Sequence, residues 1–199
     1  MALKYQYNKV EMQRLQKDLK IRVNALPTLK SKEAYLRVVI KRQKEKLAEL
    51  EEDLDRKRLE ITKNERLWSE FSDQLVRISG VQLQTGIVAG VKVPELKEID
   101  YAIEQVSPFL RPSWFPWGVA TAKELERMVV EISIAKRGID LLEYARKKTT
   151  QKVNLYEKVQ IPDYNEAILK IKRYLEDVEN LSKASQKITK NRQIEGAVA

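Results

Sequence analysis

Residues 12–61 read MQRLQKDLKIRVNALPTLKSKEAYLRVVIKRQKEKLAELEEDLDRKRLEI, and this stretch decides the fold. Counting by sevens from Met12 to Leu75 meets an apolar residue at nine of ten places, the exception being Glu33. A seven-residue apolar repeat sustained this long is typical of a helix wound against a partner in a left-handed supercoil. The buried row of this first arm is predicted to include Leu19, Ile40, Leu47, Leu54, Ile61 and Trp68.

A companion row, four residues before each of these places, is polar at Gln43, Lys57 and Asn64. If the chain folds back near residue 100, Lys57 lies within one turn of Glu143, and an ion pair between them would fix the register of the two arms. The alternative is that Lys57 extends its ammonium group into water, and the two interpretations are about even. Pro27 also falls inside the first arm, and we expect it to kink the helix rather than end it, because the repeat continues past it.

A second apolar repeat runs through residues 122–188, and its buried row is predicted to include Leu125, Ile132, Ile139 and Val153. Beyond Pro162 the repeat resumes at Ile168 displaced by about one residue, which predicts a local change of winding. Because residues 12–78 and 122–188 are equally long, the chain is expected to pair its arms nearly end to end. The predicted fold is all-α: a long antiparallel two-helix left-handed coiled coil, with a small β-hairpin and a short irregular or helical segment between the arms.

The composition changes between the arms. Ser79-Gly80 is expected to end the first helix. The β-branched residues and glycines of 81–93 predict a β-hairpin that Pro94 stops, and a short helix is expected over residues 95–105. The chain is thereby divided into an N-terminal arm (1–78), a foot region (79–120) and a C-terminal arm (121–199).

The foot ends in a run of proline and aromatic residues at 111–118. Its aromatic side chains, Trp114, Phe115 and Trp117, form either a small core that seals the foot or an exposed docking patch, and we favour the core. Thr121 is expected to cap the second arm, since Glu124 follows at capping-box spacing.

The chain lacks cysteine and histidine, which excludes a cysteine nucleophile, a Ser-His-Asp triad, a zinc site of thiolate or imidazole ligands and a disulfide framework. It has no phosphate-binding glycine loop and no aromatic residues interleaved with a basic row, so we expect no enzyme activity, no cofactor and no nucleic-acid partner. It also has no stretch of about 20 apolar residues and no signal peptide, so we expect a cytoplasmic location.

The net charge of +9 is concentrated at the two ends of the chain. Such basic ends attract an acidic partner, although solvated helix ends would look the same. Antiparallel arms would bring the two ends side by side. The candidate contact residues are Lys4, Lys9, Arg14, Lys17, Lys20 and Arg22 at one end and Lys183, Lys187, Lys190 and Arg192 at the other.

Three segments carry a family resemblance: LKSKEAYL at 29–36, GVKVPEL at 90–96 and QKVNLYEKVQIP at 151–162. With them the chain resembles the D subunit of the V/A-type ATPases in element order over about its whole length. The third segment is the most specific, whereas heptads alone would fit many coiled coils. The chain departs from the family pattern at Leu155-Tyr156 and at Pro27.

The resemblance implies a central-stalk rotor subunit that transmits torque between an ATP-hydrolysing or ATP-synthesising head and an ion-translocating membrane rotor. It implies as partners the catalytic and regulatory subunits of the head, the small F subunit of the central stalk and the cap subunit of the membrane rotor. The chain would meet the membrane only indirectly, as a peripheral part of the complex, and its basic ends would face the head.

A different class of protein remains as the alternative, namely a free-standing coiled-coil scaffold or a protein that binds membrane surfaces. That function would need a basic row along one long face. Here the positive charge gathers at the ends instead.

Overall fold

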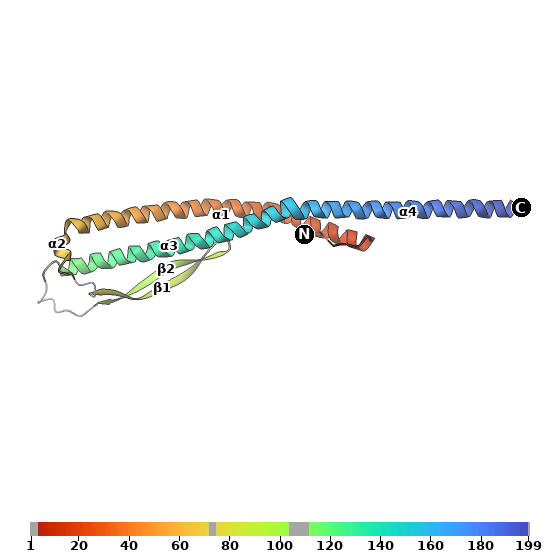
Figure 1. The fold of residues 1–199 in the computed structure, drawn as a ribbon. Helices are drawn as coiled ribbons and strands as arrows, with labels where there is room; N and C mark the ends of the chain where they lie inside the picture. Colours follow the sequence, from red (N-terminus) through yellow and green to blue (C-terminus); the bar gives the residue numbers. More distant parts are fainter. Residues whose placement is uncertain (1–3, 72–74, 104–111, 199) are drawn as a thin grey trace. The chain divides into compact units, whose positions relative to one another are not determined.

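The computed structural model describes residues 4–71, 75–103 and 112–198. Its elements are α1 (Lys9–Lys63), α2 (Glu65–Trp68), β1 (Val76–Val88), β2 (Val91–Ile103), α3 (Phe115–Leu155), the π-helical turn η2 (Tyr156–Gln160) and α4 (Ile161–Val198) (Figure 1). The chain divides into two compact units, one made of residues 32–148 and the other of residues 1–31 with 149–199. The long helix pair and the two-stranded hairpin confirm the predicted all-α class with a small hairpin.

Helix α1 begins at a side-chain cap and then runs without interruption. The Oδ1 of Asn8 accepts a hydrogen bond from the backbone N–H of Glu11 at 2.6 Å, which satisfies one of the free amides of the first turn. The helix continues through Pro27 for 55 residues, a length of about 80 Å. It ends at Lys63, so the prediction that Ser79-Gly80 ends it is wrong, and both residues lie in strand β1. The apolar repeat suggested a longer helix here because Leu75, which fits the repeat, belongs to a different core together with Val76.

In the unit of residues 32–148, α1 and α3 run antiparallel (Figure 1). Two cross-helix ion pairs show the direction: the Nζ of Lys44 lies 2.6 Å from a carboxylate oxygen of Glu143, and that of Lys136 lies 2.7 Å from Glu51. Between the helices Leu36, Ile40 and Leu142 form a buried core. Leu36 and Leu142 are almost fully enclosed, so this core is a principal source of stability for the unit.

The β-hairpin packs its tip on that core. Ala89 and Gly90 form a two-residue connection with φ values of 53° and 73°, as a type I′ turn requires, and Val88 pairs with Val91 across it. The side chains of Val88, Ala89, Val91 and Val93 pack against the Leu36 core. The hairpin therefore belongs to the packed structure of the unit.

The hairpin is longer than predicted. Strands β1 and β2 pair from Val76 opposite Ile103 to the turn, with register shifts after Ile78 and after Gln82. Pro94 pairs with Thr85 inside the ladder instead of stopping it. A two-stranded ribbon has two unpaired edges, and a proline without an N–H is tolerated there. The short helix predicted over 95–105 is therefore wrong as far as Ile103, and residues 104 and 105 lie outside the described part.

The foot of this unit holds an aromatic core. Leu75, Val76 and Phe115 are buried, and Phe71 and Trp114 pack against them. Phe115 and Trp114 are thus packing residues, whereas the side chain of Trp117 is 52% exposed.

Helix α3 begins earlier than expected, at Phe115, and includes Pro116 in its first turn, where a missing N–H costs little. Thr121 accordingly lies inside the helix. Its hydroxyl donates to the carbonyl of Trp117 at 3.0 Å, so the predicted cap at Thr121 is wrong.

In the other unit, the first part of α1 packs against α4. Leu15, Tyr164, Ala167 and Ile171 form the buried core. Met12, Leu19, Ile168 and Leu175 pack around this core. Farther along, Lys30 binds Glu157 at 2.6 Å.

The winding changes just before Pro162, as the displaced repeat predicts. Tyr156–Gln160 form a π-helical turn between α3 and α4. A single π turn inside an α-helix accommodates one extra residue. The one-residue displacement of the apolar repeat therefore has its physical cause in η2, and the buried row returns to α1 at Tyr164.

Candidate docking surfaces

Most of the basic candidates in the first arm are available to a partner. Lys4, Lys9, Lys17 and Lys20 are exposed. Arg14 is exposed as well and forms an ion pair at 2.7 Å with Glu11, three residues before it. The Arg14 side chain is 64% exposed and that of Glu11 is 16% exposed, so the guanidinium can also reach a carboxylate of a partner.

Arg22 is engaged within the chain. Its Nε donates to the Oε1 of Gln160 at 2.8 Å, and its guanidinium lies 4.5 Å from the centre of the Tyr164 ring. It also donates to the carbonyl of Asp18 at 2.9 Å. These contacts join α1 to the η2–α4 segment. Arg22 therefore stabilises the helix pair and is less available to a partner than the exposed lysines.

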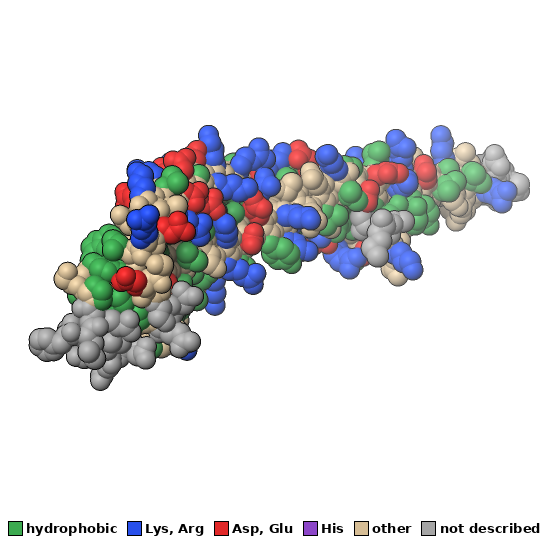
Figure 2. Space-filling model, turned by 60° about the vertical axis from the view of Figure 1, so that its left-hand side comes forward, with side chains coloured by type: hydrophobic (Ala, Val, Ile, Leu, Met, Phe, Trp, Pro, Cys, Tyr) green, Lys and Arg blue, Asp and Glu red, His purple; other side chains and the backbone are tan. Residues whose placement is uncertain are grey.

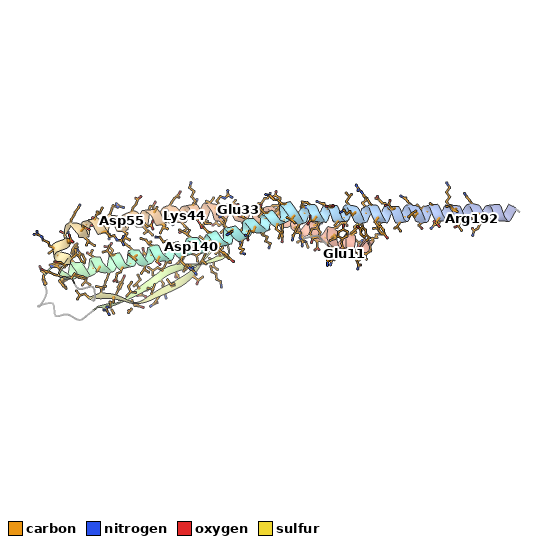
Figure 3. The ribbon with its side chains drawn as sticks, viewed as in Figure 1. Glu11, Glu33, Lys44, Asp55, Asp140 and Arg192 are labelled. Carbon is orange, nitrogen blue, oxygen red and sulfur yellow. The ribbon has the colours of Figure 1, made fainter. Side chains whose placement is uncertain are left out.

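The basic candidates at the other end lie on a part of α4 that α1 does not reach. Every residue from 176 to 193 is exposed, including Lys183, Lys187, Lys190 and Arg192. Figure 3 shows Arg192 near the end of α4 and Glu11 near the start of α1, well separated along the helix direction.

The prediction that the two basic ends lie side by side is therefore wrong for the described residues. The first arm ends at Lys63 instead of residue 78, so its partner residues fall earlier in the second arm. Leu15 packs on Ile171, and α4 continues beyond this contact as an exposed tail, residues 176–193.

Three tyrosines mark the place where the helix pair stops. The ring of Tyr7 lies 5.0 Å from that of Tyr174, and the ring of Tyr5 lies 5.7 Å from that of Tyr7. Tyr5 packs against the Leu15 core, and burial raises the pKa of its hydroxyl. This contact was not predicted from the sequence, although two tyrosines just before the first heptad are a signal of packing.

The predicted seam residues are all buried or partly buried. Ile40, Leu54, Ile132, Ile139 and Val153 are buried. Another group is partly buried: Leu19, Leu47, Ile61, Trp68 and Leu125.

The polar seam residue Lys57 does not meet Glu143. It binds Glu124, while Glu143 binds Lys44, so the predicted register is wrong by 13 residues counted from Glu143 and by 19 counted from Lys57. The hydrogen bond from Lys44 lowers the pKa of the Glu143 carboxyl. The register differs from the predicted one because α1 ends at Lys63 instead of residue 78. Each residue of α1 therefore meets an earlier residue of α3.

In the unit of residues 32–148, α1 and α3 leave an open groove of about 550 Å³ near Lys57. Its walls carry both signs of charge, with Asp53, Glu60, Glu124 and Glu131 facing Arg56, Lys57 and Arg127. Basic and acidic side chains of the groove form ion pairs with one another, as Lys57 does with Glu124. A small-molecule site is usually more enclosed and more apolar.

A carboxyl that was not predicted from the sequence, that of Glu126, lies beside the hairpin. Burial raises the pKa of Glu126, and one of its carboxylate oxygens is buried without a hydrogen-bond partner among the described residues. Burial and the negative charge of Glu126 also raise the pKa of Tyr101, whose hydroxyl donates to the carbonyl of Lys123 at 3.0 Å. No spacing pattern in the sequence singles out Glu126, because its burial depends on the hairpin.

Charge on the visible side of the helices is mixed. Figure 2 shows Asp and Glu side chains among those of Lys and Arg there. Within the described ranges, no helix is both long enough and apolar enough to cross a bilayer.

Comparison with known proteins agrees with this architecture. The family model described as the D subunit of ATP synthase matches residues 11–191. The chain is similar to the V-type ATP synthase D subunit of Borreliella burgdorferi, with 30% identity over 196 residues that cover 94% of each chain. It is also similar to the proteins of the same name from Chlamydia abortus, at 29% identity over 87% of this chain and 82% of the relative, and from Chlamydia pneumoniae, at 27% over 76% and 75%. With a match over nearly its whole length, the chain belongs to the family of ATP synthase D subunits.

Proposed function

We propose that the chain is the non-catalytic central-stalk rotor subunit of a V/A-type ATPase. It transmits torque between the head that hydrolyses or synthesises ATP and the membrane rotor that moves ions. The observation that carries the proposal is the family match over residues 11–191, which covers a helix pair with a buried apolar core in each of the two compact units.

The architecture suits a mechanical role. A rotating subunit must resist twisting, and paired helices with interlocked side chains resist it better than a single helix does. Helix α1 passes as one element of 55 residues from the Leu15 core to the end of the seam at Ile61. A twist applied at one end of α1 is thereby carried by continuous backbone hydrogen bonds.

The proposed partners follow the same division. The catalytic and regulatory subunits of the head would contact the basic residues of the first arm and the tail of α4. The small F subunit of the central stalk would bind the side of the coil, and the cap subunit of the membrane rotor would receive the foot, residues 79–120. The complex would place the chain in the cytoplasm, peripheral to the membrane.

A rotation assay tests the proposal directly. The chain has no cysteine, so Gln84→Cys in the exposed part of β1 supplies a single attachment point for an optical probe. In a complex with the immobilised head, the probe should turn in one direction when ATP is added and stop when ATP is exhausted. ATP hydrolysis at the full rate with a stationary, firmly attached probe would refute the torque role.

The rival function as a free-standing or membrane-binding scaffold is tested by sedimentation with anionic vesicles. The mixed charge on the face in Figure 2 does not favour it. Pelleting of the purified chain with vesicles, together with failure to co-purify with ATPase head subunits, would support the rival.

A further inference from the structure

Helix α1 is one backbone hydrogen bond short at Pro27. This proline lies inside the helix and has no N–H, so no amide is available four residues after Val23 to donate to its carbonyl. The proline ring also crowds that carbonyl, and a proline inside a helix is a common cause of bending. The helix continues to Lys63, but the ladder of hydrogen bonds along it is weakest at this point.

The chain that packs against this part of α1 is weakened as well. The N–H of Ile161 donates to the carbonyl of Tyr156, five residues earlier, which is the wider bond of the π turn η2. The next residue is Pro162, which again has no N–H to donate. A π turn and a proline therefore follow one another directly, and each is a recognised cause of helix bending.

The two weakened places lie at the same height of the helix pair. Lys30 binds Glu157 at 2.6 Å, and the Nε of Arg22 donates to the Oε1 of Gln160 at 2.8 Å. Pro27 lies between Arg22 and Lys30 on α1, and the residues that these two contact both belong to η2. All five residues are part of the same compact unit. Both helices of the pair are thus weakened at one place.

Side-chain packing is also thin at this height. Among residues 16–35 of α1 none is buried, and the same holds for residues 154–163. Beyond this stretch Leu15 packs with Tyr164, and Val153 is buried. Buried apolar side chains are the main source of stability between paired helices. Their absence over this stretch therefore lowers the cost of separating the two helices.

Arg22 holds the helices together where buried apolar side chains do not. Besides its bond to Gln160, its guanidinium lies 4.5 Å from the centre of the Tyr164 ring. The side chain is 22% exposed, so these contacts are partly shielded from water. The pair of Lys30 with Glu157 is about half exposed and contributes less. Arg22 is thus the stronger of these two polar links.

We propose that the helix pair has a joint at this height, formed by residues 22–30 of α1 and residues 156–164 of η2 and α4. The two segments open and bend together, and Arg22 acts as a latch that keeps the joint closed. The missing hydrogen bonds make each helix easier to bend, and the thin core makes the helices easier to separate. In the proposed rotor this joint would yield first to torque. The joint itself is a property of the free chain and does not depend on that function.

Hydrogen exchange of the purified full-length chain tests the joint. In the wild-type chain, amides in both segments of the joint should exchange at least tenfold faster than those of the Leu15 core on the same helices. Pro27→Ala supplies the missing amide and should slow exchange at least tenfold in both segments. Thr28→Ala, at the exposed neighbouring position, is the control. It raises helix propensity without adding an amide, so its effect should be much smaller.

Two variants test the latch. Arg22→Met keeps the aliphatic stem and removes the polar contacts, so exchange should become at least tenfold faster in both segments. Gln160→Ala leaves Arg22 on the Tyr164 ring and should have a smaller effect in the same direction. Arg42→Met, at an exposed position of α1, is the matched control and should leave exchange unchanged. Circular dichroism and thermal unfolding check that each variant keeps the helix pair, and Gln160→Ala alone tests the latch if Arg22→Met does not fold.

Bending of α1 is measured with two spin labels, because the chain has no cysteine of its own. Gln13→Cys and Ser31→Cys place the labels at exposed positions on one face of the helix. They lie 18 residues apart, which is five helical turns and about 27 Å. The distribution of distances between the labels should be broad in this chain and narrow when Pro27→Ala is added.

Uniform protection along the wild-type helix pair would overturn the inference, and so would a distance distribution that Pro27→Ala leaves unchanged. If Pro27→Ala slows exchange in α1 but not in η2 and α4, the two helices do not open together, and the joint is refuted. Wild-type exchange in both Arg22→Met and Gln160→Ala would refute the latch. All of these results leave the proposed function standing, because the rotation assay tests it separately.

Discussion

Lys44 on α1 and Glu143 on α3 form an ion pair, with 2.6 Å between the ammonium nitrogen and a carboxylate oxygen. The pair sets Lys44, and not Lys57, opposite Glu143. It therefore reports the register of the two helices at a place where apolar side chains alone would permit a slip of whole heptads.

A double-mutant cycle on this pair should show a small positive coupling. Both side chains are about half exposed, so solvent screens the pair and the coupling should not exceed about 1 kcal/mol in unfolding experiments at neutral pH. Lys44→Met and Glu143→Gln are the single changes. The matched cycle of Lys57→Met with Glu143→Gln should give none. Coupling in the second cycle and not in the first would mean that the register is the one expected from the sequence.

The same pair has a defined pH dependence. The pKa of Glu143 is lowered in the folded chain, so its contribution is present above the pKa of the unfolded state. It should be lost as pH falls through the lower folded value. The coupling measured at a pH well below that folded value should therefore vanish.

Glu126 should behave in the opposite way. Its pKa is raised by burial, so the charged form is disfavoured in the folded state, and replacement by neutral glutamine should stabilise the chain at pH 7. The advantage should shrink as pH falls through the raised pKa and disappear below the unfolded value of about 4.3. Urea unfolding of Glu126→Gln at pH 7 and pH 4 measures this, with the exposed Glu60→Gln as control. A destabilised variant at pH 7 would show that the carboxylate has a favourable role.

Gly138 on α3 should be required for docking of the hairpin. A Cβ at this position would lie 2.9 Å from a methyl group of Val93, closer than van der Waals contact allows. Alanine favours the helix by about 1 kcal/mol, so Gly138→Ala should keep α3 helical while loosening the hairpin tip. Hydrogen exchange at the amides of Val91 and Val93 should become faster. Adding Val93→Ala should restore slow exchange, and failure of this rescue would show that the effect is not steric.

The π turn η2 should be dispensable. Deleting Val159, a partly exposed residue, removes the extra residue and brings the apolar rows before and after the turn into one regular frame. Thermal stability should remain within a few degrees of the wild-type value. Deleting exposed Arg42 from α1, where no π turn absorbs the change, rotates all later side chains by about 100° and should cause a much larger loss. Equal losses in the two variants would refute this account of η2.

The seam could be predicted from the sequence because burial between two helices imposes one period over many turns. From Met12 to Ile61 every heptad position that was assigned an apolar role lies buried or partly buried. The displaced repeat after Pro162 was visible for the same reason, since a π turn leaves a one-residue signature in the frame.

The foot could not be predicted in the same way. Trp68 and Leu75 fit the heptad count, but they pack with Phe71 and Phe115 in a separate core. Strand β2 lost its alternation at the bulges and at Pro94, so its second half did not read as a strand. The pairing of Lys44 with Glu143 depends on the lengths of the first helix, the hairpin and the foot. Because these lengths were predicted wrongly, the predicted register was wrong as well.

The open tail of α4 has a consequence for how this chain can vary. Residues 176–193 share no packing with the seam, so a substitution there leaves the free energy of unfolding of the helix pair almost unchanged. Cellular proteases degrade chains in proportion to their unfolded fraction, which this free energy sets, so they would not remove such variants. If the tail acts in assembly, as proposed, natural selection acts on it there, whereas selection on Leu36 or Ile171 acts on folding, before any partner is met.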